Sequence, residues 1–391
     1  MVKPFQFSRL PKIHFRNGII TELTSIIQLY GKRIILVTGN SSFIKSGTAD
    51  RLFHDFKEAG IGYSVLSVKD EPSPDLIDNA IKIFNNEEFN LVVGIGGGSV
   101  MDTGKAISAM LYRSESVVDY LEGVGDKEHP GTKIPYIAIP TTSGTGSEAT
   151  KNAVISRIGR NGFKRSLRHD NFVPDIAMID PELTLHCPKD ITAASGMDCF
   201  TQLTEAYLSV KSNEYTDALA LEGLKAIRSS LQRSYTNGED PEARAGMSFA
   251  ALTSGICLAN AGLGVVHGFA SSIGGFSHLS HGRICGTLMA KSNEVNIREL
   301  RKTGDNPHGL KKYAILGELF LGKSEKPDDY FIDGFADYLY KVSAELKLTG
   351  LGKPAFEEKD LDLICSKTEI KNNPVRLTTE NLHEIAASVI Q

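Results

Sequence analysis

Short β-branched segments alternate with amphipathic segments through the first half of the chain, and this alternation restricts the fold more than any other feature. Strands are expected at residues 33–38, 62–68, 91–96 and 135–139, and helical spacing covers 76–84 and 106–111. Strands separated by helices form a parallel, doubly wound sheet, in which ligands bind at the carboxyl ends of the strands. The pattern therefore predicts an α/β N-terminal domain built on a parallel sheet.

The second half of the chain lacks such β-branched segments. After about Leu185 the apolar residues recur with a helical period over 191–210, 216–231 and 244–258, which predicts an all-helical second domain. A chain of 391 residues also exceeds what a single core usually holds. We therefore expect two domains, an α/β domain at 1–185 and an all-α domain at 186–391.

Charge and cysteine content exclude several classes of protein. The 43 basic and 47 acidic residues give a net charge of −4, and no Lys/Arg-rich run is present to follow a phosphate backbone, so nucleic acid is not an expected partner. The five cysteines, at 187, 199, 257, 285 and 365, are odd in number and lack CxxC spacing. That usage favours reduced thiols. Residues 1–15 hold two prolines and no apolar core, so no signal peptide is expected. These features predict a cytoplasmic protein.

Residues 245–282 contain no Asp, Glu, Lys or Arg, yet they hold His267, His278 and His281. Imidazole is costly to bury unless a hydrogen-bond partner or a metal satisfies its nitrogens. Two interpretations stay open: core histidines bonded to backbone carbonyls, or ligands of zinc or iron. The segment is long enough to span a membrane, but its glycines, asparagine and histidines favour buried helices, so no membrane partner is expected.

A run of three glycines follows the third expected strand and opens a helix. Glycines let the backbone approach a diphosphate closely, and the amide groups at a helix N-terminus favour negative charge. The run matches neither the GxGxxG nor the P-loop motif, and a tight strand-to-helix turn is the alternative. We predict that the diphosphate of a dinucleotide is cradled by Gly96, Gly97, Gly98 and Ser99.

A second loop, at residues 140–150, follows the next expected strand and is rich in hydroxyls and glycines. Loops at that edge of a parallel sheet face the ligand, although Ser/Thr/Gly loops are common. Its candidate cofactor residues are Thr141, Thr142, Thr145 and Ser147, and we expect Asp102 to help this loop hold the nicotinamide end.

Residues 196–207 read as a helix that carries candidate metal ligands. Asp198 and Gln202 are four residues apart and share a helix face, whereas Glu205 is expected to point elsewhere. His267 and His281 are 14 residues apart, and we expect glycines 274 and 275 to interrupt the helix between them. One carboxylate and two imidazoles can hold a divalent metal and leave a position open for substrate.

Together these motifs resemble one known family. The segments are GGGSVMDTGK, PTTSGTGSEAT, VPDIAMIDPELT, ASGMDCFTQLTEAY, GLGVVHGFASSIGG and SHG, with NPVRLT at 373–378. In this order, from about residue 10 to 388, they are similar to the iron-containing, or group III, alcohol dehydrogenases of the dehydroquinate synthase-like superfamily. The combination is specific, although each segment alone is not.

The resemblance implies a dinucleotide-binding domain followed by an all-helical domain that holds a divalent metal, Fe²⁺ or Zn²⁺. It implies hydride transfer between NAD or NADP and a primary alcohol or aldehyde substrate, by a homodimer. Asp198, His267 and His281 match three of the family's four metal-ligand positions, and Gln202 stands at the fourth. Lys164 matches a lysine near the cofactor ribose, and His278 is a candidate proton relay, with a packing role as the alternative. Further candidate cofactor residues are Gly39, Asn40, Ser41, Ser73 and Leu183.

Two departures from the family pattern leave alternatives open. Gln202 offers a neutral carbonyl oxygen where the family has histidine, so the metal is expected to bind weakly or to be absent. Ser271 stands where many members carry another active-site histidine. A metal-free reductase of the maleylacetate reductase type and a non-catalytic nucleotide-binding relative are the alternatives; dehydroquinate synthases resemble the chain less.

The end of the first expected strand bears on the choice of cofactor. Many NAD-specific relatives carry an aspartate there, which binds the ribose 2′-OH and repels a 2′-phosphate. This chain has Gly39, followed by Asn40 and two serines. Without the carboxylate, amide, hydroxyl and helix N-terminal groups can receive the phosphate. We therefore predict that NADP(H) is accepted and preferred over NAD(H).

Overall fold

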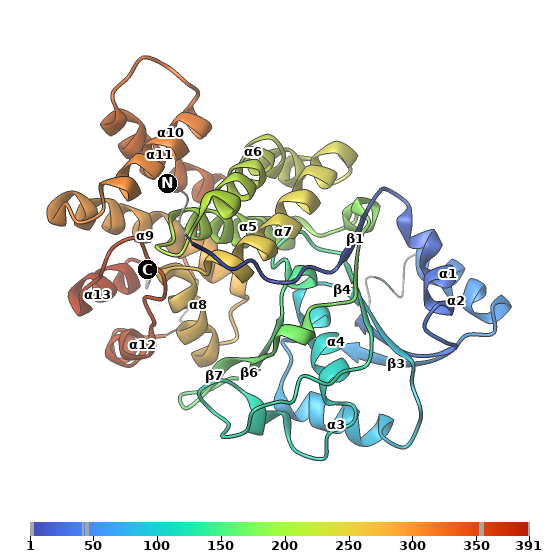
Figure 1. Cartoon of the computed structure of the whole chain (residues 1–391). Helices are drawn as coiled ribbons and strands as arrows, with labels where there is room; N and C mark the ends of the chain where they lie inside the picture. Colours follow the sequence, from blue (N-terminus) through green and yellow to red (C-terminus); the bar gives the residue numbers. More distant parts are fainter. Residues whose placement is uncertain (1–3, 41–42, 44–46, 352–355, 390–391) are drawn as a thin grey trace. The chain divides into compact units, whose positions relative to one another are not determined.

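The computed structural model describes residues 4–40, 43, 47–351 and 356–389. They divide into two compact units, an α/β unit at 8–157 and 164–187, and a helical unit that contains 158–163 and 188–389 together with residues 4–7. The division after residue 187 lies two residues beyond the expected boundary. Figure 1 shows the strands in the first part of the chain and the long helices in the second.

A six-stranded parallel sheet forms the centre of the α/β unit, with the order β1-β8-β5-β4-β2-β3. Its strands are β1 (Lys12–Phe15), β2 (Arg33–Gly39), β3 (Gly62–Val68), β4 (Leu91–Gly96), β5 (Tyr136–Pro140) and β8 (Ile176–Ile179). Strands β4 and β5 are buried along their whole length, which is why they read as continuous apolar runs. The predicted parallel sheet is confirmed, and β1 and β8 are additions to it.

The strand order reverses between β2 and β4. From β2 the chain moves outward to β3 and then returns to the other side of β2 for β4. Thr38 of β2 lies beside Ile95 of β4, so Gly39 and Gly96 end neighbouring strands at the same sheet edge. In doubly wound sheets, ligands bind in the crevice at such a reversal.

Helices and short 3₁₀ turns connect the strands of this unit. The helices are α1 (Leu23–Gln28), α2 (Gly47–Glu58), α3 (Pro74–Phe84) and α4 (Gly98–Met110). The 3₁₀ turns are η1 (Ile19–Glu22), η2 (Val117–Tyr120), η3 (Ser147–Ala149), η4 (Asp170–Phe172) and η5 (Pro181–Thr184). A separate two-stranded sheet, β6 (Asn152–Arg157) with β7 (Phe163–Arg168), was not expected from the sequence.

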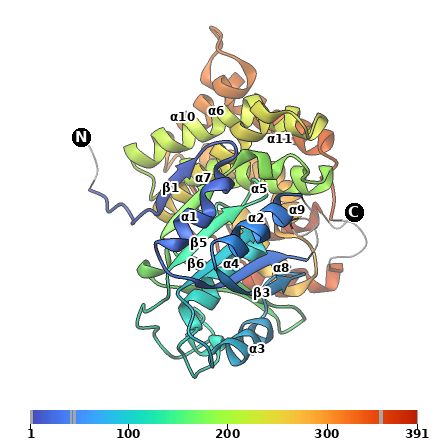
Figure 2. The same cartoon turned by 90° about the vertical axis from the view of Figure 1, so that its right-hand side faces the viewer.

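The second unit is helical, as predicted. Its helices are α5 (Lys189–Leu208), α6 (Glu214–Thr236), α7 (Pro241–Ala261), α8 (Val265–Phe276), α9 (His281–Thr303), α10 (Pro307–Leu321), α11 (Asp328–Glu345), α12 (Leu361–Lys367) and α13 (Thr379–Ala387), with a 3₁₀ turn η6 (Glu358–Asp360). Helix α5 packs against α6, α7 and α9, and it is buried on most of its surface. Helices α10 and α11 pack against each other and lie side by side in Figure 1. Figure 2 gives the same structure turned by 90°.

The histidine-bearing segment forms α8 and the start of α9. The expected break between His267 and His281 is confirmed, but it lies at residues 277–280, because α8 runs through Gly274 and Gly275 and ends at Phe276. Both glycines are buried, and tertiary packing overrides their poor helix propensity. Among the described residues no single helix has the length and hydropathy of a membrane span; α7 and α8 reach them only as a pair bent by 99°.

Candidate functional site

The glycine run lies in the predicted strand–turn–helix context. Gly96 ends β4, Gly97 caps the N-terminus of α4, and Gly98 is the first residue of that helix. A Cβ at Gly98 would lie 2.6 Å from Thr145 Cγ2, and one at Gly97 would lie 3.3 Å from Thr142 Oγ1. The turn is thus narrow on the side of the second loop, and its free amide groups favour an anion.

The second loop lies beside the first, as expected for neighbouring strands. Strand β5 pairs with β4, and Thr141 N donates a hydrogen bond to Gly96 O at 2.9 Å. Thr142 and Thr145 lie against the glycines of the first loop. Four candidate residues of two loops are therefore gathered at one edge of the sheet.

Buried polar groups fasten the second loop to α4. Lys105 Nζ donates to Ser147 O at 2.8 Å and to Thr150 Oγ1 at 3.0 Å, and Ser147 Oγ donates to Asp102 Oδ1. Burial lowers the pKa of Lys105 to about 8, although Asp102 and Glu148 oppose that shift. Burial raises the pKa of Glu148 to about 7 and also raises the pKa of Asp102. Asp102 and Ser147 thus already bond each other, and their contact with a cofactor stays a prediction.

Two other predicted cofactor residues, Ser73 and Lys164, have structural partners. Ser73 caps α3, because its Oγ accepts a hydrogen bond from Leu76 N at 3.2 Å. Lys164 in β7 forms an ion pair with Glu71. Gly39 ends β2 and Asn40 is exposed just after it, while Ser41 lies outside the described residues. Their roles toward a cofactor remain predictions.

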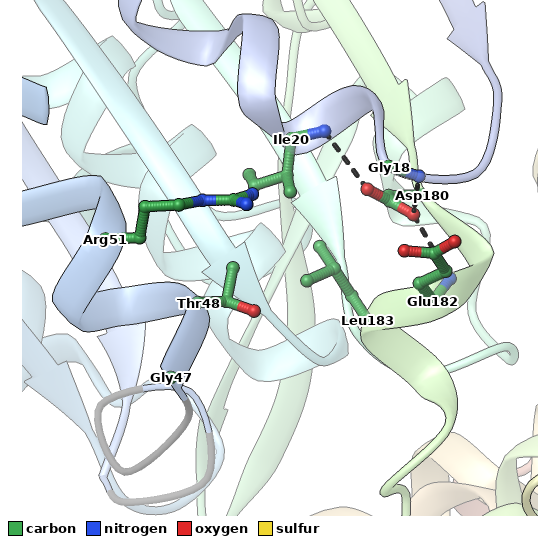
Figure 3. Close-up of a pocket in the computed structure, with 8 residues that line it drawn as sticks. All are labelled: Gly18, Ile20, Gly47, Thr48, Arg51, Asp180, Glu182 and Leu183. Carbon is green, nitrogen blue, oxygen red and sulfur yellow. Dashed lines mark hydrogen bonds between the residues drawn. The ribbon is translucent and has the colours of Figure 1, made fainter.

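The remaining predicted cofactor residue, Leu183, lines a cavity of about 260 Å³ in the α/β unit. Figure 3 shows the side chain of Arg51, from α2, extending toward Ile20. Leu183 lines the opposite side of the cavity. Gly47 and Thr48, at the N-terminus of α2, form a third side. Its lining is Gly18, Ile20, Gly47, Thr48, Arg51, Asp180, Glu182 and Leu183. A guanidinium and a helix N-terminus make the cavity suitable for an anionic group beside an apolar one. The sequence analysis missed Arg51, since it lies 12 residues beyond Gly39.

Within the helical unit, Asp198, His267, His281 and Cys285 meet, and all of their ligand atoms lie within 4.8 Å of one another. Asp198 Oδ1 is 3.3 Å from His267 Nε2 and 3.6 Å from His281 Nε2. Cys285 Sγ is 3.8 Å from His267 Nε2. The structure thus brings together the predicted ligands Asp198, His267 and His281 and adds a cysteine that the sequence analysis did not assign.

Glu205 orients His267 from the side opposite this cluster. His267 Nδ1 lies 2.7 Å from Glu205 Oε2, and Val266 N donates to Glu205 Oε1 at 2.7 Å. The carboxylate holds the proton on Nδ1, so Nε2, which faces Asp198, is the nitrogen left for a metal; carboxylates commonly orient metal-binding histidines in this way. The expectation that Glu205 points elsewhere is wrong. Its spacing of seven residues from Asp198, two helical turns, was the signal that could have revealed it.

Burial and the neighbouring charges shift the pKa values of the groups in this cluster. Burial alone would raise the pKa of Asp198, but His281 and His267 outweigh it and hold that pKa at about 2. Burial would lower the pKa of His267, yet Cys285 and the two carboxylates raise it well above the ordinary value. Burial raises the pKa of Cys285 to about 11. A metal must therefore displace protons from this cluster in order to bind.

The other candidates in this unit differ in their surroundings. Gln202 is buried on α5, and its Oε1 lies 3.1 Å from Ser254 Oγ, which donates to it. His278 is exposed in the segment between α8 and α9, so the alternative of a packing role is wrong. Ser271 Oγ donates to His267 O at 2.9 Å. Roles for Gln202 as a weak ligand and for His278 as a proton relay stay predictions.

The donors of the cluster fit a divalent transition metal. One carboxylate oxygen and two imidazole nitrogens are ligands that Fe²⁺ and Zn²⁺ accept, and a position remains for a further ligand. Asp198 and His267 are buried, and the side chain of His281 is 24% exposed. Access from solvent therefore runs past His281.

Known proteins match the chain over both units. The family model described as iron-containing alcohol dehydrogenase matches residues 11–181, and that of the C-terminal domain of the Fe-containing alcohol dehydrogenases matches 192–390. The NAD-dependent methanol dehydrogenase of Bacillus methanolicus is 30% identical over 387 residues, covering 96% of this chain and 97% of that protein. The choline dehydrogenase of Bacillus subtilis is 35% identical over 376 residues, covering 94% and 90%.

Solved structures agree with these matches. The alcohol dehydrogenase from Oenococcus oeni superposes with a TM-score of 0.87 at 26% identity, over 99% of this chain and 100% of that one. The similarity therefore extends from the sequence motifs to the whole fold.

Proposed function

Because the chain belongs to the iron-containing alcohol dehydrogenase family and is an oxidoreductase acting on alcohols, we propose that it transfers a hydride between a nicotinamide dinucleotide and a primary alcohol or aldehyde. The observation that carries this proposal is the cluster of Asp198, His267 and His281. Its three donors are those that a catalytic metal needs. The alternatives of a metal-free reductase and a non-catalytic relative are not favoured, since these three donors lie together and the relatives that match most of the chain include alcohol dehydrogenases.

Residues of the metal cluster and of the glycine turn have separate roles in this reaction. The chemistry that a divalent ion supplies in such a cluster is Lewis-acid polarisation of the alcohol or carbonyl oxygen. Asp198 contributes negative charge, and Glu205 keeps His267 in the tautomer whose Nε2 faces Asp198. Gly97 and Gly98 let a diphosphate reach the N-terminus of α4. The exposed imidazole of His278 is suited to exchanging the substrate proton with solvent.

For the cofactor, we propose that NADP(H) is accepted and preferred. Gly39, at the end of β2, presents no carboxylate to repel a 2′-phosphate. Arg51 and the N-terminus of α2 supply positive charge in the cavity that Leu183 also lines. An apolar wall suits an adenine ring, and a guanidinium suits a phosphate.

Cellular setting and assembly are part of the same proposal. We propose a cytoplasmic homodimer that acts on a small alcohol or aldehyde. Thiols of Cys257, Cys285 and Cys365 are buried within the helical unit, which suits a reducing compartment. Light scattering of the purified protein checks the dimer, and a mass equal to one chain would contradict it.

The test combines metal analysis with activity. Freshly purified protein is expected to contain one divalent ion per chain, to oxidise primary alcohols with NADP⁺ or NAD⁺, and to lose activity on chelation. His267→Ala is expected to lose both the ion and the activity. Protein that carries no metal and whose turnover is indifferent both to chelator and to His267→Ala would overturn the metal-dependent mechanism.

A further inference from the structure

Cys285 lies on α9 one helical turn after His281, so both side chains project from the same face of that helix. Its thiol is buried, and Sγ is 3.8 Å from His267 Nε2. All four ligand atoms, from Asp198, His267, His281 and Cys285, lie within 4.8 Å of one another. The thiol therefore shares one small volume with the three proposed metal ligands.

Three of the donor separations are close to those of a tetrahedral site. Bond lengths of about 2.0–2.1 Å for imidazole or carboxylate and about 2.3 Å for thiolate place neighbouring donors about 3.3–3.6 Å apart. The observed separations are 3.3 Å and 3.6 Å from Asp198 Oδ1 to the two imidazoles, and 3.8 Å from Cys285 Sγ to His267 Nε2. For these three pairs, shifts of a few tenths of an ångström would give tetrahedral separations, and the other three pairs lie within 4.8 Å.

Gln202 is a weaker candidate for the fourth position. Its carbonyl oxygen already accepts a hydrogen bond from Ser254 of α7. An amide oxygen is neutral, whereas a thiolate is anionic and polarisable and binds Zn²⁺, Fe²⁺ and Co²⁺ more strongly.

We propose that Cys285 is the fourth protein ligand of the metal. The ion is then held by one carboxylate oxygen, two imidazole nitrogens and one thiolate sulfur. On binding, the S–H bond of Cys285 breaks, a sulfur–metal bond forms, and the proton leaves to solvent. With four protein ligands, a substrate oxygen would need a fifth position, an expansion that catalytic zinc sites allow in the transition state. This inference rests on the proposed function, because it assumes that the cluster binds a metal.

The closing experiment reads the sulfur ligand directly. Apo-protein is loaded with Co²⁺ in the absence of substrate, and the thiolate-to-cobalt charge-transfer band is recorded in the near ultraviolet. The band is expected in the parent protein and in Cys257→Ser, and it is expected to be absent from Cys285→Ser. Cys257 is a matched control, because it is a buried thiol of the same unit whose Sγ contacts Thr216 O at 3.7 Å, outside the cluster.

Metal affinity gives a second readout. Loss of a direct ligand should weaken Co²⁺ binding at least as much as loss of an orienting residue, by about 10-fold or more. Cys285→Ser is expected to show this loss, and Gln202→His in the Cys285→Ser background is expected to restore affinity without restoring the sulfur band. An unchanged Co²⁺ affinity in Cys285→Ser overturns the proposal.

A measurement on the unmodified chain avoids any dependence on how the variants fold. X-ray absorption at the zinc edge of the Zn²⁺-loaded parent is expected to show one sulfur neighbour at about 2.3 Å. A parent protein that binds metal with only nitrogen and oxygen neighbours overturns the role of Cys285 and leaves the proposed function standing. A parent protein that binds no divalent metal overturns both.

Discussion

Glu205 Oε2 and His267 Nδ1 lie 2.7 Å apart in the interior of the helical unit, and they join α5 to the start of α8. The other oxygen of the same carboxylate, Oε1, accepts a hydrogen bond from Val266 N at 2.7 Å. Both oxygens of Glu205 are therefore used to fix the histidine and the backbone beside it. His267 is thereby held with its other nitrogen 3.3 Å from Asp198.

Glu205→Gln is expected to weaken metal binding by about 10- to 100-fold, as loss of a carboxylate behind a ligating histidine commonly does. The amide has the same shape, but it removes the charge that keeps the proton on Nδ1. Titration of apo-protein with Zn²⁺ against a competing chelator measures the effect. Glu222→Gln is the control, because Glu222 is an exposed helical glutamate paired with Lys225. Equal affinities for the parent and Glu205→Gln would contradict the orienting role.

Gly97→Val is expected to abolish binding of the dinucleotide without unfolding the protein. A Cβ at this position already comes 3.3 Å from Thr142 Oγ1, so the larger side chain must lie where the diphosphate approaches α4. Fluorescence titration with NADPH and NADH measures binding, and circular dichroism checks the fold. Gly123→Ala is the control, because a Cβ there meets nothing within 4 Å; its positive φ carries only a backbone cost. Unchanged cofactor affinity in folded Gly97→Val would refute the loop assignment.

Gly39→Asp is expected to move the preference from NADP(H) toward NAD(H), because a carboxylate at the end of β2 repels the 2′-phosphate. Arg51→Ala is expected to lower kcat/KM for NADPH more than for NADH, because only NADPH carries the 2′-phosphate that the Arg51 guanidinium is proposed to bind. The ratio of kcat/KM values for the two cofactors measures both effects. An unmodified protein that strongly favours NAD(H), or an Arg51→Ala variant with an unchanged ratio, would argue against the cofactor proposal.

Glu148→Gln is expected to flatten the pH dependence of stability between about pH 4.5 and 7. The pKa of Glu148 is raised by burial from 4.5 to about 7 in the folded chain, so the folded state holds its proton more tightly than the unfolded state. Its contribution is therefore fully present below pH 4.5 and is lost as the pH rises through 7. The loss is at most about 3 kcal/mol.

Thermal unfolding midpoints of apo-protein at several pH values measure this effect. The parent is expected to lose stability over the window relative to the variant, with the difference levelling off above pH 7. Parallel profiles for the parent and Glu148→Gln would show that Glu148 does not titrate there.

Much of the α/β unit was predictable because its strands are long and buried. Residues 34–37 and 91–95 are apolar runs that lie within the strands β2 and β4, each of which ends in glycine. The four-residue strands β1 and β8 were missed, since a short segment shows no clear period. The fold of Gly274 and Gly275 into α8 was also missed, because burial rather than local propensity decides it.

The sequence by itself determined the family, the order of the two units, and the candidate ligands Asp198, His267 and His281, because these depend on motifs whose residues are close along the chain. Only the tertiary structure decided that Glu205 bonds His267, 62 residues away, and that Cys285 approaches His267 from α9, 18 residues further along the chain. Such contacts depend on which helix faces pack together. Periodicity specifies the buried face of each helix but not its partner, since many pairs of apolar faces can bury similar areas.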